Sequence, residues 1–184
     1  ARAGISADTA ATAATAASLW AGNDITTTAT VDAAAVTVNA GNDAALATIL
    51  AGAGGADIDA GAALILNGDV DANTGAVTID AGGLITQDGA IGSDNNTASV
   101  AIVSAEGSLD SNNTIDAVTS IDITTGANVD LANAVTAGTS IGIDAGGTVD
   151  AAAILSGGTS VSVAGDDDVN LVQVLASAGD TSIA

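Results

Sequence analysis

Asp110, Asp130 and Asp150 are spaced by 20 residues, and each directly follows an apolar residue. If equivalent positions of a repeat stack on one another, these carboxylates form a line along one face, with neighbours about 5 Å apart. In water, two such charges repel by roughly 1 kcal/mol or a little less per pair. A Ca²⁺ ion held between neighbours, about 2.4 Å from their oxygens, would reverse that sign. The spacing leaves two interpretations open, a calcium-stabilised face and a solvated acidic face whose side chains spread apart.

The run Asp166-Asp167-Asp168 is a second group of carboxylates. Adjacent acids could bind Ca²⁺, but this spacing matches neither an EF-hand loop nor the nonapeptide calcium repeat. We therefore expect a solvated turn at this run, with calcium binding as the alternative.

Thr-Ser pairs recur in the same part of the chain, at 119–120, 139–140, 159–160 and 181–182. We expect all of these pairs to stack in register. Flat ladders of threonine can bind ice, so an ice-binding β-solenoid is a minor alternative. The outward positions that follow the first three pairs hold Asp122, Gly142 and Ser162 rather than threonine. Hydroxyl groups that hydrogen-bond along a corner are the structural alternative.

The residue inventory excludes most enzyme chemistry. The chain has no His and no Cys, so a Ser-His-Asp triad, a catalytic thiol and the usual zinc sites cannot be built. β-Helix enzymes that cut acidic polysaccharides place Lys or Arg beside their acids, and the only basic residue here is Arg2. Paired aspartates could hydrolyse a glycoside, but the single aromatic residue, Trp20, makes no sugar-binding platform. We expect the protein not to be an enzyme.

The charge excludes several classes of partner. The chain carries 22 acidic residues against one basic residue, and its net charge is −21. Nucleic-acid binding needs Lys and Arg to neutralise phosphates, and an anionic membrane surface would repel the chain. No apolar run approaches the roughly 18 residues of a membrane-spanning helix. We expect no nucleic-acid partner and no membrane insertion.

A repeat of about 20 residues positions these side chains. One apolar column contains Val38, Ile58, Ile79, Ile102, Ile123, Ile143 and Val163, with Leu19 as a weaker start. A second column follows about six residues later: Ile25, Leu46, Leu64, Leu84, Leu109, Val129, Val149 and Val169. A third follows after about six more: Val31, Leu50, Val70, Ile91, Ile115, Val135, Leu155 and Leu175.

Short segments with period-2 alternation are typical of strands, and the Gly, Asn and Asp residues between them are typical of turns. We predict an all-β, three-faced parallel β-helix of about eight coils over residues 19–184. Coils about 4.8 Å apart make a rod on the order of 40 Å long. The 23 glycines and the near absence of Lys and Glu argue against helical repeats, and the columns in register argue against disorder.

Two regions depart from this pattern. Residues 1–18 are rich in Ala and form either one more coil or a short helix that covers the end. We favour the coil, since Ile5 stands 20 residues before Ile25. The stretch 91–99 lengthens its coil and is expected to protrude as a surface loop.

The blocks TSIDITTGANVDLANAVTAG, TSIGIDAGGTVDAAAILSGG and VTIDAGGLITQDGAI resemble the repeats of large bacterial exoproteins of the filamentous haemagglutinin kind. The resemblance covers residues 20 to 184 and is one of repeat style. It implies a right-handed parallel β-helix that is secreted to the cell surface or the extracellular space.

The residues DTSIA at the end of the sequence begin another coil, in which we expect Ile183 to be the counterpart of Val161. Unpaired strand edges at an open coil act as templates for further strands. The partners that we expect are therefore copies of the chain, stacked head to tail into a filament, or the rest of a longer adhesin.

The expected function is structural, as a segment or subunit of an extracellular bacterial fibre, sheath or adhesin. The alternative is an adhesin module that binds a host or glycan ligand through an outer face or the 91–99 loop.

Overall fold

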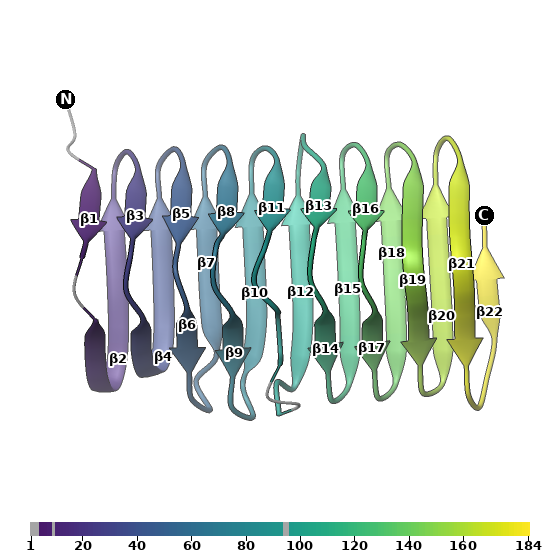
Figure 1. Ribbon diagram of the computed structural model, residues 1–184, viewed down its shortest axis with the longest axis horizontal. Helices are drawn as coiled ribbons and strands as arrows, with labels where there is room; N and C mark the ends of the chain where they lie inside the picture. Colours follow the sequence, from purple (N-terminus) through teal and green to yellow (C-terminus); the bar gives the residue numbers. More distant parts are fainter. Residues whose placement is uncertain (1–3, 9, 94–95) are drawn as a thin grey trace.

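The computed structural model describes residues 4–8, 10–93 and 96–184, which form a rod built of strands without a helix (Figure 1). The chain makes about nine turns of about 20 residues, and each turn adds one level to three ladders of parallel pairs. At about 4.8 Å per turn the rod is about 43 Å long. The sequence predicted about eight coils. The difference comes from the two ends, where Ile5, Ala11 and Ile183 each add one more level to a ladder.

Face A contains the first predicted apolar column. Its strands are the C-terminal parts of β2 (Ala11–Ala21) and β4 (Val31–Ala40), then β7 (Ala56–Ala60), β10 (Ala76–Ala81), β12 (Ser99–Ser104), β15 (Ser120–Thr125), β18 (Ser140–Ala145), β20 (Ser160–Gly165) and β22 (Thr181–Ile183). The register is direct, so that Ile79 lies level with Ile58 on one side and Ile102 on the other.

Face B contains the second column. Its strands are β1 (Ile5–Ala7), β3 (Ile25–Thr27), β5 (Ala44–Leu46), β8 (Leu64–Leu66), β11 (Ile85–Gln87), β13 (Leu109–Ser111), β16 (Val129–Leu131) and the N-terminal parts of β19 (Val149–Gly157) and β21 (Val169–Ala176).

Face C contains the third column. Its strands are the N-terminal parts of β2 and β4, then β6 (Ile49–Ala51), β9 (Val70–Ala72), β14 (Ile115–Ala117), β17 (Val135–Ala137) and the C-terminal parts of β19 and β21. A single bridge at Ile91 carries this ladder from β9 to β14.

The side chains that alternate inward from the three faces fill the rod. The predicted face A column is buried throughout, with exposed fractions of 0 to 3 % for Val38, Ile58, Ile79, Ile102, Ile123, Ile143 and Val163. On face B, Val129 and Val149 are likewise buried, whereas Val169 in the terminal coil is partly buried and packs against the same core. Interior Ala residues such as Ala72 and Ala81 fit because the space between three close faces is narrow.

Four predicted column members are wrong by one or two residues. The face B column passes through Ala44 and Ile85 rather than Leu46 and Leu84, and the face C column passes through Ile49 and Val174 rather than Leu50 and Leu175. Leu46 is still buried, two positions further along its strand, but Leu84, Leu50 and Leu175 are exposed. At each of these three positions the chain has two adjacent apolar residues, and only one of the two can point inward because side chains alternate along a strand.

Polar side chains at the corner between faces A and B bind the backbone of the next coil. The Oδ1 of Asp43 accepts the N–H of Ala63 at 3.0 Å, and the Oγ of Ser108 accepts the N–H of Asn128 at 3.1 Å. The Oδ1 of Asn128 then accepts the N–H of Thr148 at 3.0 Å. These hydrogen bonds satisfy backbone N–H groups that have no partner in the strand ladders, and they connect successive corners.

Glycine at the same corner lets successive backbones approach closely. A Cβ atom added to Gly146 would lie 2.5 Å from the carbonyl oxygen of Gly126, one coil earlier. On the flat part of face A, by contrast, a Cβ atom on Gly142 would meet only the flexible Asp122 carboxylate, at 3.0 Å.

We predict that Gly146→Ala lowers the free energy of unfolding by about 1–3 kcal/mol, because the added methyl group overpacks the corner. Chemical denaturation followed by far-ultraviolet circular dichroism measures the change. Gly142→Ala is the matched control and is expected to change stability by less than about 0.5 kcal/mol. Equal losses in the two variants would contradict this account of the corner.

Candidate functional site on the outer faces

Asp110, Asp130 and Asp150 lie level with one another on the outer side of face B, on β13, β16 and β19. Asp110 is half-buried, and the other two side chains are exposed. The row continues with Thr86 before Asp110 and with Asn170 after Asp150. Because neighbouring strands are about 4.8 Å apart, the register places three carboxylates within about 10 Å along the rod.

The middle carboxylate of this row has a raised pKa. Although this side chain is exposed, partial desolvation of its carboxylate by the surrounding chain is the larger cause, and the negative charges of Asp110 and Asp150 on either side raise the pKa of Asp130 further. Both causes act against the charged form, because desolvation and neighbouring like charges each favour a bound proton.

Two further aspartates share this behaviour. Burial raises the pKa of Asp57 on face A, and the charge of Asp59 two residues later adds to the effect. Burial also raises the pKa of Asp116 on face C, where hydrogen bonds with Thr136 and Thr114 act in the opposite direction. On all three faces, the outer surface therefore carries a carboxylate that the native fold disfavours in its charged form.

The acidic rows do not make a metal centre in the described part of the chain. Among residues 4–8, 10–93 and 96–184, no three His, Cys, Asp or Glu side chains group in a way that could hold a metal ion. Asp110, Asp130 and Asp150 follow the rod axis in a line and do not surround one point. Calcium binding by this row stays a prediction from the sequence.

Asp166, Asp167 and Asp168 lie in the turn between β20 and β21, and their side chains are exposed. The N–H groups of Asp166 and Asp167 donate to the carbonyl oxygens of Ala145 and Gly147, at 3.1 and 3.3 Å. The backbone of the turn is thus bound to the preceding coil while the carboxylates face solvent. Calcium binding here likewise stays a prediction.

The first three Thr-Ser pairs stack at the corner that precedes face A. Ser120, Ser140 and Ser160 lie level with one another. The N–H groups of Thr139 and Thr159 donate to the carbonyl oxygens of the threonines one coil earlier, at 2.8 and 2.6 Å. Backbone bonds therefore connect these corners.

The fourth pair does not join this stack, and its expected alignment is wrong. Ser182 lies level with Ser162, and Thr181 lies level with Val161. Ile183 is therefore the counterpart of Val163 and not of Val161. The coil from Val163 to Ile183 keeps the length of 20 residues, but this dipeptide stands 22 residues after the preceding one, so it falls on a strand instead of a corner.

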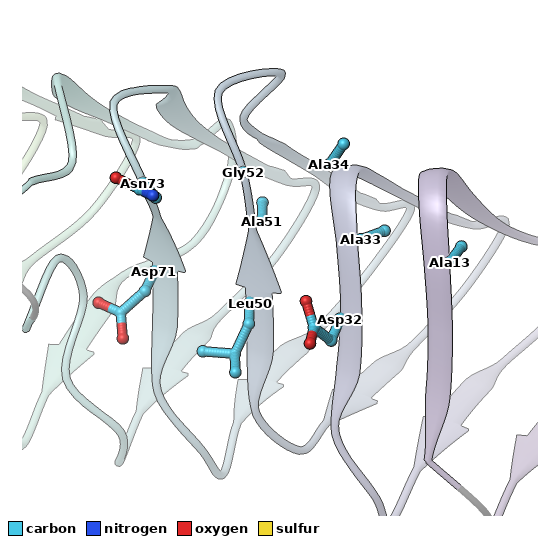
Figure 2. Close-up of a pocket in the computed structure, with 9 residues that line it drawn as sticks. All are labelled: Ala13, Asp32, Ala33, Ala34, Leu50, Ala51, Gly52, Asp71 and Asn73. Carbon is cyan, nitrogen blue, oxygen red and sulfur yellow. The ribbon is translucent and has the colours of Figure 1, made fainter.

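A shallow groove of about 400 Å³ crosses face C near the N-terminal end. Figure 2 shows Asp32, Leu50 and Asp71 projecting from β4, β6 and β9, with Leu50 between the two carboxylates. Asp71 is only 9 % exposed, and the hydroxyl of Ser93 donates to both of its carboxylate oxygens, at 3.2 and 3.0 Å. The groove is lined by these two carboxylates, the amide of Asn73, and the apolar side chains of Leu50 and four alanines.

The predicted 91–99 loop is fixed at its base. Thr97 is fully buried, and its Oγ1 accepts the N–H of Ala72 at 3.1 Å. Gly92 adopts a positive φ of 72°, a backbone conformation that favours glycine. Residues 94 and 95 lie outside the described residues.

A buried polar cluster beside this loop escaped the sequence analysis. Gln87 is fully buried on β11, and its Nε2 donates to the carbonyl oxygens of Gly89 and Thr114, at 2.9 and 3.0 Å. Its Oε1 accepts the hydroxyl of Ser111 at 2.7 Å. Gln87 lies level with Leu66, so in this inward row a polar side chain replaces an apolar one. The signal was present in the spacing, since Gln87 stands two residues after the inward Ile85.

No protein-family model matches the chain, and neither a curated protein nor a solved structure shows significant similarity to it. In the described residues, no helix has the length and apolar character needed to cross a membrane. The parallel β-solenoid is shown by its ladders, whereas the resemblance to haemagglutinin-type exoproteins stays a prediction.

We predict that acidification stabilises the rod between neutral pH and about pH 4. The native state holds the proton of Asp130 more tightly than the unfolded chain, whose aspartates keep an ordinary pKa near 3.8. The associated stability is fully present below that value and is lost as pH rises through the raised pKa. Asp130→Asn should therefore raise the free energy of unfolding at pH 7 by a few tenths of a kcal/mol, and by less at pH 4.

The matched control is Asp144→Asn on face A, because the residues level with Asp144 are the uncharged Thr124 and Ala164. Urea denaturation at pH 4, 5.5 and 7 measures both variants. If Asp130→Asn raised the free energy of unfolding equally at all three pH values, or if Asp144→Asn raised it as much, the aspartate row would not have the destabilising effect that we assign to it.

Proposed function

We propose that the chain is a structural rod, a subunit or segment of an extracellular bacterial fibre, sheath or adhesin, and that its coils stack end to end on further coils. The observation that carries the proposal is the continuity of the three parallel ladders along the whole described rod. Nearly every described segment of the chain forms either a strand of these ladders or a corner between two strands. A protein built in this way supplies length and stiffness rather than an enclosed binding site.

The terminal coils support end-to-end stacking. Within the described residues, β1 and β2 at one end each pair with a strand on one side only, and the same holds for β21 and β22 at the other end. Inward apolar side chains in these coils, such as Leu19 and Val174, are only partly buried. Unpaired edges and half-covered apolar side chains are both satisfied when another coil of the same type stacks on them.

The charge supports growth along one axis. Apart from Asp71, the acidic residues of the described part are exposed or half-buried on outward rows and turns, whereas the coil ends present backbone groups and apolar side chains. Like-charged rods repel one another side by side, and the strand edges attract at the ends. The combination favours thin single filaments over bundles.

The resemblance of the repeats to secreted bacterial exoproteins supports an extracellular location. The absence of cysteine is compatible with secretion without disulfides. Arg2 alone offers a cleavage site to trypsin-like proteases, which suits a protein exposed to them.

A second candidate is a binding role for the 91–99 loop, in line with an adhesin module that recognises a host or glycan ligand. The observation in its favour is the fixed base of the loop, in which Thr97 is buried and Ser93 is bonded to Asp71. Loops held by a rigid scaffold often carry recognition.

Sedimentation velocity over a range of concentrations, with electron microscopy of the same samples, tests the structural proposal. We expect rods of constant width whose lengths are multiples of about 43 Å. Ile183→Asp should lower assembly strongly, because a stacked coil would bury the new carboxylate. Val118→Asp, at a half-exposed corner in the middle of the rod, is the matched control and should assemble normally.

A chain that stays monomeric at the highest concentrations would contradict self-assembly. The roles as a segment of a longer adhesin and as a ligand-binding module would then be favoured.

A further inference from the structure

The groove on face C carries a charged, an apolar and again a charged side chain in one row. Asp32, Leu50 and Asp71 lie level with one another on β4, β6 and β9, and all three project outward from the strands (Figure 2). Because neighbouring strands are about 4.8 Å apart, the Cα atoms of the two aspartates are about 9.6 Å apart. Leu50 lies between them, with 36 % of its surface exposed.

Small residues keep the groove open beside this row. Ala33, Ala34, Ala51 and Gly52 line it together with Asn73. A Cβ atom added to Gly52 would lie 3.0 Å from the Cα atom of Ala34, so the backbones of these two coils are close together. The volume of about 400 Å³ is typical of sites for small molecules. The groove therefore has room for a narrow ligand that lies along the row.

Asp71 is the most buried acid of the described residues, with 9 % of its surface exposed. The hydroxyl of Ser93 donates to both of its carboxylate oxygens, and the N–H of Gly92 holds this segment to the carbonyl oxygen of Val70 at 3.0 Å. The two oxygens of a carboxylate can accept further hydrogen bonds, since together they present about four lone-pair sites. Burial of a charge is costly unless an opposite charge accompanies it, so a cation is the partner that this carboxylate favours.

Such cations come almost entirely from outside the chain. The sequence has 22 acidic residues, no lysine and a single arginine, and its net charge is −21. A surface with so much charge of one sign concentrates oppositely charged molecules close to it. The groove on face C adds a specific arrangement of charge to this general attraction.

We propose that the groove binds a linear polyamine, a chain of methylene groups with ammonium groups along it. One ammonium group donates hydrogen bonds to the carboxylate of Asp71, and a second donates to that of Asp32. The methylene groups between them pack against Leu50. Hydrogen bonds between ions fix the two ends of the ligand, and burial of the methylene groups against an exposed leucine adds affinity.

Other cations match this row less well. A single Ca²⁺ ion needs its oxygen ligands at about 2.4 Å, and it cannot contact two carboxylates whose Cα atoms are about 9.6 Å apart along one row. No three acidic side chains of the described residues group around a possible metal position. A ligand with two separated charges is therefore favoured over one with a single compact charge.

The aspartate row of face B provides an internal comparison. Asp110 and Asp150 are also two coils apart, but the residue between them is Asp130 instead of a leucine. That row offers more charge but no apolar contact for methylene groups. Specific binding should therefore prefer face C, whereas unspecific condensation of cations should prefer face B.

Isothermal titration calorimetry of the whole chain tests this site, with 1,6-diaminohexane as the ligand and hexylamine as its counterpart with one charge. We expect one diamine per chain, bound at least about tenfold more tightly than hexylamine at about 0.15 M salt. Asp32→Asn should lower the affinity for the diamine to about that for hexylamine and leave hexylamine binding unchanged. Leu50→Ser should weaken the binding of both ligands several-fold, because it removes the apolar contact.

Asp110→Asn/Asp150→Asn is the matched control, since it removes two charges at the same separation from face B. It should change the affinity for the diamine by less than about twofold. Asp32 and Leu50 are exposed, so their substitution leaves the core intact, and circular dichroism verifies that each variant keeps the fold.

Three results would overturn the polyamine site: many diamines bound per chain, equal affinities for the diamine and hexylamine, or a loss in the face B control as large as that in Asp32→Asn. Each would mean that amines only gather on the acidic surface. Unchanged binding in Leu50→Ser would likewise remove the groove as the site. All the residues involved belong to one chain, so the outcome does not depend on the proposed end-to-end assembly.

Discussion

The whole structure depends on parallel backbone pairing in a constant register from one coil to the next. Once each strand lies directly on its predecessor, the side-chain pattern follows, since like positions stack on like positions on every face. Inward rows such as that of Ile58, Ile79 and Ile102 become continuous apolar columns. The backbones of successive corners must also stack about 4.8 Å apart. Glycine and small polar residues occupy the corners because larger side chains would not fit at this spacing.

The same register brings like charges together, and the fold tolerates this repulsion. Asp110, Asp130 and Asp150 are held in a row because the apolar residues before them are held in the core. Desolvation is the main cause of the raised pKa of Asp130, and the charges of Asp110 and Asp150 add to it. The repulsion is spread along the outside in water, where each pair costs roughly 1 kcal/mol or less, whereas the ladders bond every coil to the next along three faces.

A solenoid differs from a closed globular domain in that its stabilising contacts have no natural end. The ladders that hold β18 to β20 are of the same kind as those that the open edges of β1 and β22 could make. In the proposed fibre, the acidic sides of neighbouring rods repel one another, whereas strand edges and apolar side chains join successive coils. We regard this contrast as the physical basis of the proposed structural role.

The sequence alone determined the fold class, the repeat length, the face A column and the row of aspartates, because their spacing survives in the linear pattern. Tertiary structure decided which of two adjacent apolar residues points inward, as with Ile85 over Leu84 and Ile49 over Leu50. It also decided that Gln87 is buried and that Thr181 and Ser182 lie on strand β22 rather than at a corner. The physical reason is that side-chain direction in a strand is set by the register with the neighbouring coil, and turns of variable length change that register without leaving a clear trace in the sequence.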